Sequence, residues 1–244
     1  MSFDHWQWAL AILGALSIGL AKTGLGGLGM LAVVIFANLL PAREASGVVL
    51  PMLVLADVVA VLSYRQHAQW RFLWKLFPWT AVGVVAGYFA LGRINDWQAQ
   101  VLIGAIILVL LAVHLWRQRR SGELAEHGAW FAPTIGVLAG FTTLVANAAG
   151  PLMAIYLLAM RLPKMEYVGT GAVYFMLMNL FKVPFMLNLG LINSSSFTLN
   201  LWLAPAVVIG AFLGKYILKK INQKLFENIA LALAGVAGIK MLFS

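Results

Sequence analysis

The feature that most constrains the fold is a series of apolar blocks, each about as long as a helix that crosses a bilayer. A transmembrane helix needs about 20 consecutive apolar residues. Charged residues make up only 10% of this chain of 244 residues, against about 25% in soluble domains. The blocks lack the polar faces that a soluble core would need, so the sequence predicts an all-α polytopic membrane protein. The six clearest blocks are 46–64, 76–92, 98–116, 167–187, 198–217 and 225–243.

Positive charge exceeds negative charge, with 17 Lys and Arg residues against 8 Asp and Glu. The basic residues are scattered over short loops, as in the cytoplasmic loops of membrane proteins. They form no patch of the kind that binds nucleic acid. The chain has no cysteine, and its four histidines show no metal-ligand spacing. We therefore expect a lipid bilayer around the protein, no nucleic-acid partner, no metal and no cofactor.

The two halves of the chain share an ordered series of matches. The stretch "LLPAREASG" (39–47) matches "RLPKMEYVG" (161–169) at a shift of 122 residues. Further on, "VGVVAGYFALGRIN" (82–95) matches "IGAFLGKYILKKIN" (209–222) at a shift of 127. The difference of five residues predicts an insertion in the second half, most simply in the loop 188–197. Internal repeats are common among secondary transporters, whose sites lie between the repeats.

The first shift also pairs Asp57 with Asn179, one residue from each half. Each half holds three of the apolar blocks, so we expect one repeat in each half. The predicted boundaries are repeat one at 1–117, a linker at 118–127 and repeat two at 128–244.

An interrupted apolar region precedes the three blocks in each repeat. In repeat one the region 8–40 is broken at 22–29, and in repeat two the region 130–160 is interrupted by "TLVANAAG" (143–150). The two pieces in repeat one would be about 21 and 17 Å long at 1.5 Å per residue, short of the ~30 Å hydrocarbon core. Each region therefore either crosses once as a broken helix or returns as a re-entrant hairpin.

The distribution of Lys and Arg over the loops distinguishes these two topologies. If both regions cross, seven loop cations lie on one side and eight on the other; if both return, twelve lie on one side and three on the other. Only the second split shows the cytoplasmic excess of a membrane protein. We therefore expect two inverted repeats, each a re-entrant hairpin plus three transmembrane helices. The linker is then cytoplasmic, and both termini are periplasmic or extracellular.

The break in repeat one, "AKTGLGGLGM" (21–30), points to a binding site. Irregular backbone at membrane depth occurs where it is buried in protein or lines an aqueous cavity, and glycine lets a ligand approach the main chain closely. A half-helix beginning near Gly27–Gly29 would direct its N–H groups at an anion, and Asn147–Pro151 begins the corresponding half-helix in repeat two. The alternative is that the glycines only pack helices closely. We assign packing to Gly14, Gly19, Gly83, Gly87, Gly210 and Gly214.

Three ionisable residues fall within the apolar segments: Lys22, Asp57 and Lys182. Such residues cost about 2.5–3.5 kcal/mol each on insertion scales and are usually functional. In the functional interpretation both lysines bind an anion and Asp57 couples transport to protons. In the alternative, Lys22 and Asp57 only neutralise each other, or Lys182 extends toward the membrane surface. The substrate-binding residues that we expect are Lys22, Thr23, Gly26, Gly27, Gly29, Asn147, Gly150, Thr170, Asn179 and Lys182.

The chain resembles the TauE/SafE family of bacterial sulfite exporters. The resemblance lies in the Gly-rich break followed by an apolar run, the Pro-centred loops "LLPAREA" and "RLPKMEY", the Gly–Thr at 169–170 and a duplicated Gly-containing helix. It covers nearly the whole chain and both halves. The resemblance implies export or exchange of small anions without ATP, among them sulfite and organosulfur anions such as sulfoacetate. It also implies a place in the inner membrane of a bacterial cell.

These observations favour a secondary transporter that exports a small anion by alternating access at a midplane site between the repeats. The alternative is an anion channel, or a permease for another small carboxylate or oxyanion, because anion pores use similar helix ends. An enzyme is disfavoured because the helices offer neither a nucleophile with a base nor a metal cluster. The sequence leaves the oligomeric state open between a monomer and a homodimer.

Overall fold

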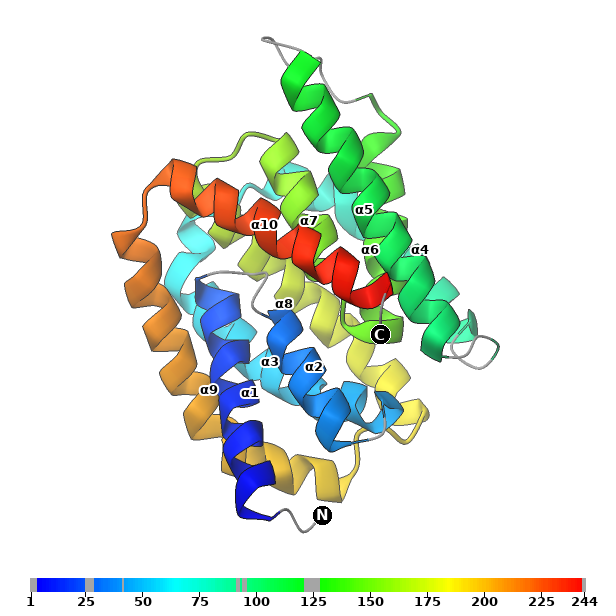
Figure 1. The fold of residues 1–244 in the computed structure, drawn as a ribbon, viewed down its shortest axis with the longest axis vertical. Coiled ribbons are helices and arrows are strands. Elements are labelled where there is room, and N and C mark those ends of the chain that lie inside the picture. Colours follow the sequence, from blue (N-terminus) through cyan, green and yellow to red (C-terminus); the bar gives the residue numbers. More distant parts are fainter. Residues whose placement is uncertain are drawn as a thin grey trace. The chain divides into compact units, whose positions relative to one another are not determined.

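The structure, a computed structural model, describes residues 4–24, 29–40, 42–90, 93, 96–120 and 128–242 (Figure 1). The described part is helical throughout, with ten α-helices and one short 3-10 helix. This confirms the predicted all-α class. The helices gather into two compact units, and neither unit coincides with one of the predicted repeats.

Unit 1 comprises Met1–Ala68 and Val168–Asn222, and so takes helices from both halves of the chain. Within it, α1 packs along α9, and α3 contacts both of them. Its helices are α1 (His5–Thr23), α2 (Gly29–Leu39), α3 (Ala42–Tyr64), the 3-10 helix η2 (Arg65–His67), most of α8 (Lys164–Asn188) and α9 (Ser194–Lys220).

Unit 2 comprises Gln69–Tyr167 and Gln223–Ser244, and it also takes helices from both halves. Within it, α4 packs along α6, and α10 contacts α5 and α7. Its helices are α4 (Trp70–Ala90), α5 (Asp96–Arg120), α6 (Phe131–Ala146), α7 (Ala149–Ala159) and α10 (Gln223–Leu242).

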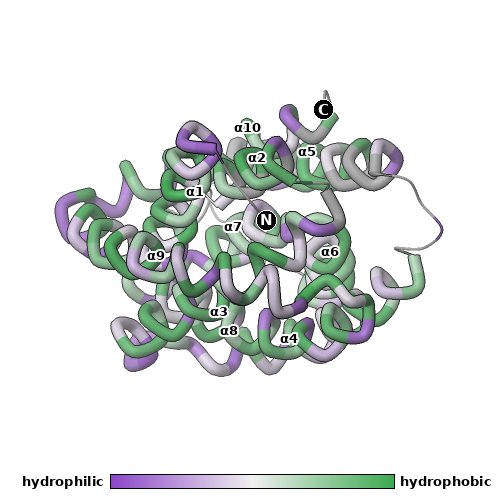
Figure 2. Tube along the Cα trace, turned by 90° about the horizontal axis from the view of Figure 1, so that it is seen from below, coloured by the Kyte–Doolittle hydropathy of each residue, from purple (hydrophilic) through white to green (hydrophobic). Residues whose placement is uncertain are grey.

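Four helices of the described part are long and apolar enough to cross a membrane: α3, α4, α8 and α9. They correspond to four of the six predicted blocks, and the other two blocks form α5 and α10. Hydrophobic residues predominate along the helices, while hydrophilic residues gather mainly near helix ends and connections (Figure 2). The composition of the helices thus agrees with a multi-pass membrane protein.

The predicted interruptions are present in both halves. In the first, α1 ends at Thr23 and α2 begins at Gly29; residues 25–28 lie outside the described part. In the second, the break is narrower than the predicted 143–150, because α6 continues to Ala146 and α7 begins at Ala149. Asn147 makes the turn with a left-handed φ of 51°.

The short helices after the breaks, α2 and α7, have 11 residues each. At 1.5 Å per residue each is about 16 Å long, so neither crosses a ~30 Å core alone. The helix before the first break is longer than predicted: α1 has 19 residues because Asp4 and Gln7 form a capping box at its start. The re-entrant path stays a prediction, with α2 and α7 as its returning halves.

The predicted site of the five extra residues was wrong. The connection from α8 to α9 spans five residues, 189–193, as does the connection from α3 to α4, 65–69. The extra residues instead lengthen the helices. Two are in α8, which has 25 residues where α3 has 23. Three are in α9, which has 11 residues before Pro205 where α4 has eight before Pro78. An inserted residue inside the bilayer keeps its backbone hydrogen bonds by joining a helix.

The same kind of close glycine contact between two helices occurs inside each unit. A Cβ at Gly19 of α1 or Gly210 of α9 would lie under 3.0 Å from backbone atoms of the other helix. In unit 2, Gly140 of α6 and Gly83 of α4 stand in the same relation. Gly83 and Gly210 are matched by the 127-residue shift. The structure therefore confirms packing as the role of these helix glycines, and the recurrence supports the predicted duplication.

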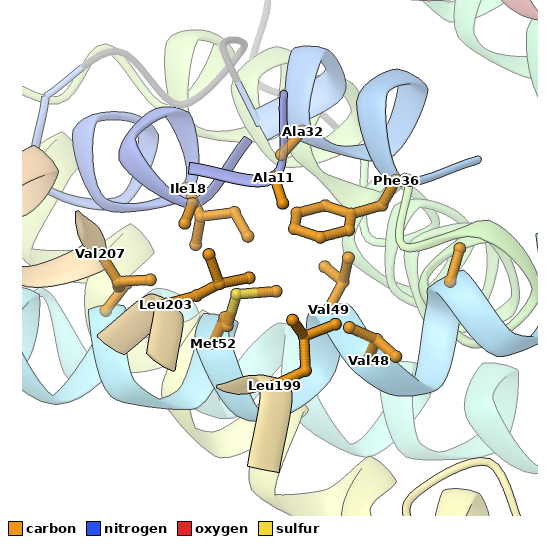
Figure 3. Close-up of a cluster of buried hydrophobic side chains, with 13 residues drawn as sticks. Ala11, Ile18, Ala32, Phe36, Val48, Val49, Met52, Leu199, Leu203 and Val207 are labelled. Carbon is orange, nitrogen blue, oxygen red and sulfur yellow. The ribbon is translucent and has the colours of Figure 1, made fainter. Parts of the chain in front are cut away.

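A buried apolar cluster joins four helices of unit 1. Side chains of α1, α2, α3 and α9 point toward one another in it, with Phe36, Met52 and Leu203 at the centre (Figure 3). Its members are at most 5% exposed. The cluster includes residues from both sides of the first break, so it fixes α2 against the end of α1. In a bilayer such contacts stabilise through close packing rather than through release of water.

Candidate functional site: a buried charge cluster

Asp57 and Lys182 are the only Asp, Glu, Lys or Arg side chains that are buried among the residues the structure describes, and both are 0% exposed. Asp57 belongs to α3 and Lys182 to α8, and both lie in unit 1. The charge of each acts on the other and on Lys22. All three predicted intramembrane charges therefore come together in one cluster.

Both carboxylate oxygens of Asp57 are engaged. Lys22 Nζ lies 2.8 Å from Oδ1, and Asn179 Nδ2 donates a 2.6 Å hydrogen bond to Oδ2. Asp57 and Asn179 are the two residues that the 122-residue shift pairs, so two matched positions of the chain touch each other directly. The cluster thus joins residues from the first and the second half of the chain.

The side of α8 that faces the cluster is a stripe of three residues. Phe175, Asn179 and Lys182 are spaced by four and three residues, which places them on one side of a helix. Lys22 Nζ lies 4.1 Å from the centroid of the Phe175 ring, a cation–π contact. Phe175 was missed by the sequence analysis, although its spacing from Asn179 would have indicated it.

The end of α1, which carries Lys22, is held by three contacts. Thr23 Oγ1 donates to the carbonyl of Ala211 in α9 (2.5 Å), and Tyr64 OH donates to the carbonyl of Thr23 (2.9 Å). Gly24 meets Gly214 of α9, where a Cβ would lie 2.8 Å from the Gly214 carbonyl oxygen. Thr23 therefore anchors the helix end. Tyr64 was missed, because a tyrosine at a helix end resembles an interfacial residue.

The other predicted site residues have different outcomes. Gly26 and Gly27 lie outside the described residues. Gly29 begins α2, and among the described residues a Cβ there would meet only Ala21 Cβ at 3.7 Å, an ordinary contact, so packing against these residues does not require glycine. Thr170 is buried, but it is nine residues before Asn179, about 13.5 Å along the helix. Its contact with substrate stays a prediction.

Asn147 and Gly150 belong to unit 2, at the turn from α6 into the start of α7. Asn147 caps the end of α6, with its backbone N–H bonded to carbonyls of Thr142 and Thr143. The described part of unit 2 buries no Asp, Glu, Lys or Arg side chain. Within the described residues, the buried charges therefore belong to unit 1.

The chemistry of the cluster is electrostatic. Two ammonium groups, one carboxylate and one carboxamide supply N–H donors and a partly compensated positive charge, which suit an anion. No group of three His, Asp or Glu side chains that could hold a metal comes together in the described part of the chain. These side chains offer charge and hydrogen-bond donors.

A family model described as "Sulfite exporter TauE/SafE" matches residues 10–241. The chain belongs to the TauE/SafE family. Neither the curated proteins nor the solved structures contain a match to it. TauE/SafE proteins are transporters and not enzymes, so membership implies export of sulfite or related sulfur anions across the membrane.

Proposed function

We propose that the protein is a secondary transporter that exports a small sulfur oxyanion, sulfite or an organosulfonate such as sulfoacetate. The cargo binds beside Lys22 and Lys182, with Asn179 as a neutral hydrogen-bond donor. Asp57 holds Lys22 when no cargo is present and serves as the candidate proton-coupling group. Transport proceeds by alternating access around this cluster.

One observation carries the proposal: the hydrogen bond between Asp57 and Asn179. Sites of secondary transporters with internal repeats lie near the midplane, where the repeats meet. Here equivalent residues of the two halves touch each other, and an ion pair with Lys22 lies at that contact. Buried charge is costly in a membrane, so its concentration at this one point supports a role in moving an anion.

The proposal includes the inverted arrangement of the repeats and the periplasmic position of both termini. Its support is the twelve-to-three split of loop cations and the length of α2 and α7, which are too short to cross. Further support comes from the helix start at Gly29, where a Cβ would make no close contact with the residues that the structure describes. Its N–H groups supply further anion donors. The protein functions as a monomer or as a homodimer.

Flux through liposomes tests the proposal. Purified protein in vesicles loaded with sulfite should export it at a rate that saturates with concentration, and an opposing gradient of unlabelled sulfite should drive counterflow of labelled sulfite. A channel would conduct without saturation in this range and without counterflow, and absence of any sulfite flux would refute the function altogether.

A matched pair of substitutions locates the site. Lys22→Gln should reduce sulfite flux at least tenfold, because it removes one cation of the cluster. Lys219→Gln makes the same chemical change at an exposed position in the last turn of α9, and should leave flux unchanged. Equal flux in the two variants would place the cargo away from the cluster.

A further inference from the structure

The ion pair between Lys22 and Asp57 has a neutral partner for each of its members, and both partners belong to α8. Asn179 Nδ2 donates a 2.6 Å hydrogen bond to Asp57 Oδ2, and Lys22 Nζ lies 4.1 Å from the centroid of the Phe175 ring. Phe175 and Asn179 are four residues apart, so they lie on the same side of the helix, about one turn from each other. When the pair separates, each charge therefore keeps a contact with α8.

The ring of Phe175 is itself held by a neighbour. Tyr174 is 0% exposed, and its ring packs against that of Phe175 with the centroids 5.4 Å apart and the planes at 78°. Edge-to-face contacts of this kind are favourable between aromatic rings. The negative face of such a ring attracts a cation but takes no proton from it. Phe175 thus gives Lys22 a fixed partner whose attraction does not depend on pH.

An anion that binds Lys22 competes with Asp57 for the same ammonium group. The side chain of Lys22 is 11% exposed and that of Asp57 is 0% exposed, so an anion reaches the lysine first. While the pair is intact, the carboxylate at 2.8 Å holds the ammonium in place, and the ring adds little to this.

The contribution of the ring grows when an anion takes the place of the carboxylate. Lysine is among the side chains that lose most rotamer freedom when they are ordered, and the ring then keeps Lys22 in contact with α8. Only an interaction that differs between the free and the bound state changes affinity. The contact with Phe175 meets this condition because it matters most after Lys22 has left Asp57.

We propose that Phe175 is a positioning residue for the cargo, because its ring holds the Lys22 ammonium in place when a bound anion separates it from Asp57. Phe175 acts on the anion through Lys22 rather than by touching it. This inference rests on the proposed function, since it concerns the same site and the same cargo.

Fluorinated phenylalanines at position 175 test the proposal. One, two or three ring fluorines withdraw electron density from the ring face in steps, and so weaken its attraction for a cation while the shape of the side chain is nearly kept. Methanesulfonate is the probe, because it is a small sulfonate of the class proposed as cargo. Its affinity for detergent-solubilised full-length protein is measured by equilibrium dialysis at one pH and one ionic strength.

Methanesulfonate affinity should fall with each added fluorine and should be at least about fivefold weaker with three fluorines than with none. A cation–π contact corresponds to a factor of about 2 to 30 in an equilibrium constant, which includes this change. The same series at Phe212 is the matched control, because that ring lies on α9 and is 60% exposed. Fluorine there should leave the affinity unchanged.

Ordinary substitutions distinguish the positioning of Lys22 from a general packing role. Phe175→Tyr keeps the ring face and should retain methanesulfonate affinity within about twofold, whereas Phe175→Leu should lower it at least about fivefold. In a Lys22→Met background no ammonium is left to hold, so Phe175→Leu should cause no further loss. A ring that served packing alone would lower the affinity equally in both backgrounds.

The outcomes separate the inference from the function on which it rests. Affinity that does not change along the fluorine series at position 175 overturns the inference and leaves anion binding intact. An equal loss from Phe175→Leu with and without Lys22 does the same. If the wild type neither binds methanesulfonate nor transports sulfite, the proposed function fails, and the inference fails with it.

Discussion

The ion pair between Lys22 and Asp57 should make the two residues strongly non-additive in stability. Removing one partner of a buried pair costs about 3–5 kcal/mol, because the other charge is left uncompensated. Asp57→Asn leaves both lysines without a carboxylate, so we expect a loss near 5 kcal/mol. Lys22→Met leaves Asp57 with the charge of Lys182 and the hydrogen bond from Asn179, so we expect about 3 kcal/mol.

The double variant Lys22→Met/Asp57→Asn removes the pair as a unit and leaves neither charge of it behind. It should cost no more than Asp57→Asn alone, about 5 kcal/mol, against about 8 if the two effects added. The coupling energy is then about 3 kcal/mol, at the upper end of what contacting residues show. In Asp57→Asn, Lys22 keeps its cation–π contact with the Phe175 ring, which is worth about 0.5–2 kcal/mol. This contact keeps the loss of stability in that variant within the range of about 3–5 kcal/mol.

Unfolding in detergent by denaturant, followed by the fluorescence of the nine tryptophans, measures the four free energies of the cycle. The control cycle uses Lys219→Met and Glu44→Gln, two exposed positions, and should show changes within about 0.5 kcal/mol and no coupling. Additive losses at Lys22 and Asp57 would show that the pair is not formed in the folded protein, and the description of the cluster would be wrong.

Two further predictions concern topology and packing. A periplasm-dependent reporter fused to the C-terminus should be active and a cytoplasm-dependent one silent; the reverse pattern contradicts the assigned orientation. Gly19→Ala should destabilise the protein by about 3 kcal/mol, because its Cβ would meet the backbone of α9 under 3.0 Å. Gly29→Ala, whose Cβ meets only Ala21 Cβ at 3.7 Å, should cost less than about 1 kcal/mol in the same unfolding assay, and equal losses would show that the two glycines do not differ in packing.

Much of the fold was predictable because bilayer-spanning blocks and internal repeats leave direct marks in sequence. The helix class, both interruptions and the packing role of Gly19, Gly83 and Gly210 followed from composition and spacing. The pairing of Asp57 with Asn179 also followed from the shift. Their direct contact did not, because a repeat shows which positions are equivalent but not which of them lie at the meeting point.

Other features were beyond the sequence patterns for physical reasons. The shift between matched segments locates an insertion only between its two flanking matches, so the lengthening of α8 and α9 was mistaken for a longer loop. The division into compact units was not predicted either, because the exchange of helices between halves depends on three-dimensional packing. Tyr64 escaped notice since its partner is the Thr23 carbonyl, and every residue carries a carbonyl.

The central claim, that an anion binds where Asp57 meets Asn179, is tested most directly by a single thiol at that contact. The chain has no cysteine, so Asn179→Cys introduces the only one. A small membrane-impermeant anionic thiol reagent should modify it, and saturating methanesulfonate should slow the modification at least tenfold. Gly87→Cys is the control, because a Cβ added at Gly87 would lie 3.2 Å from Leu144 Cβ. It should stay unreactive with and without the anion. If position 179 reacts at the same rate in both conditions, no anion binds at the cluster.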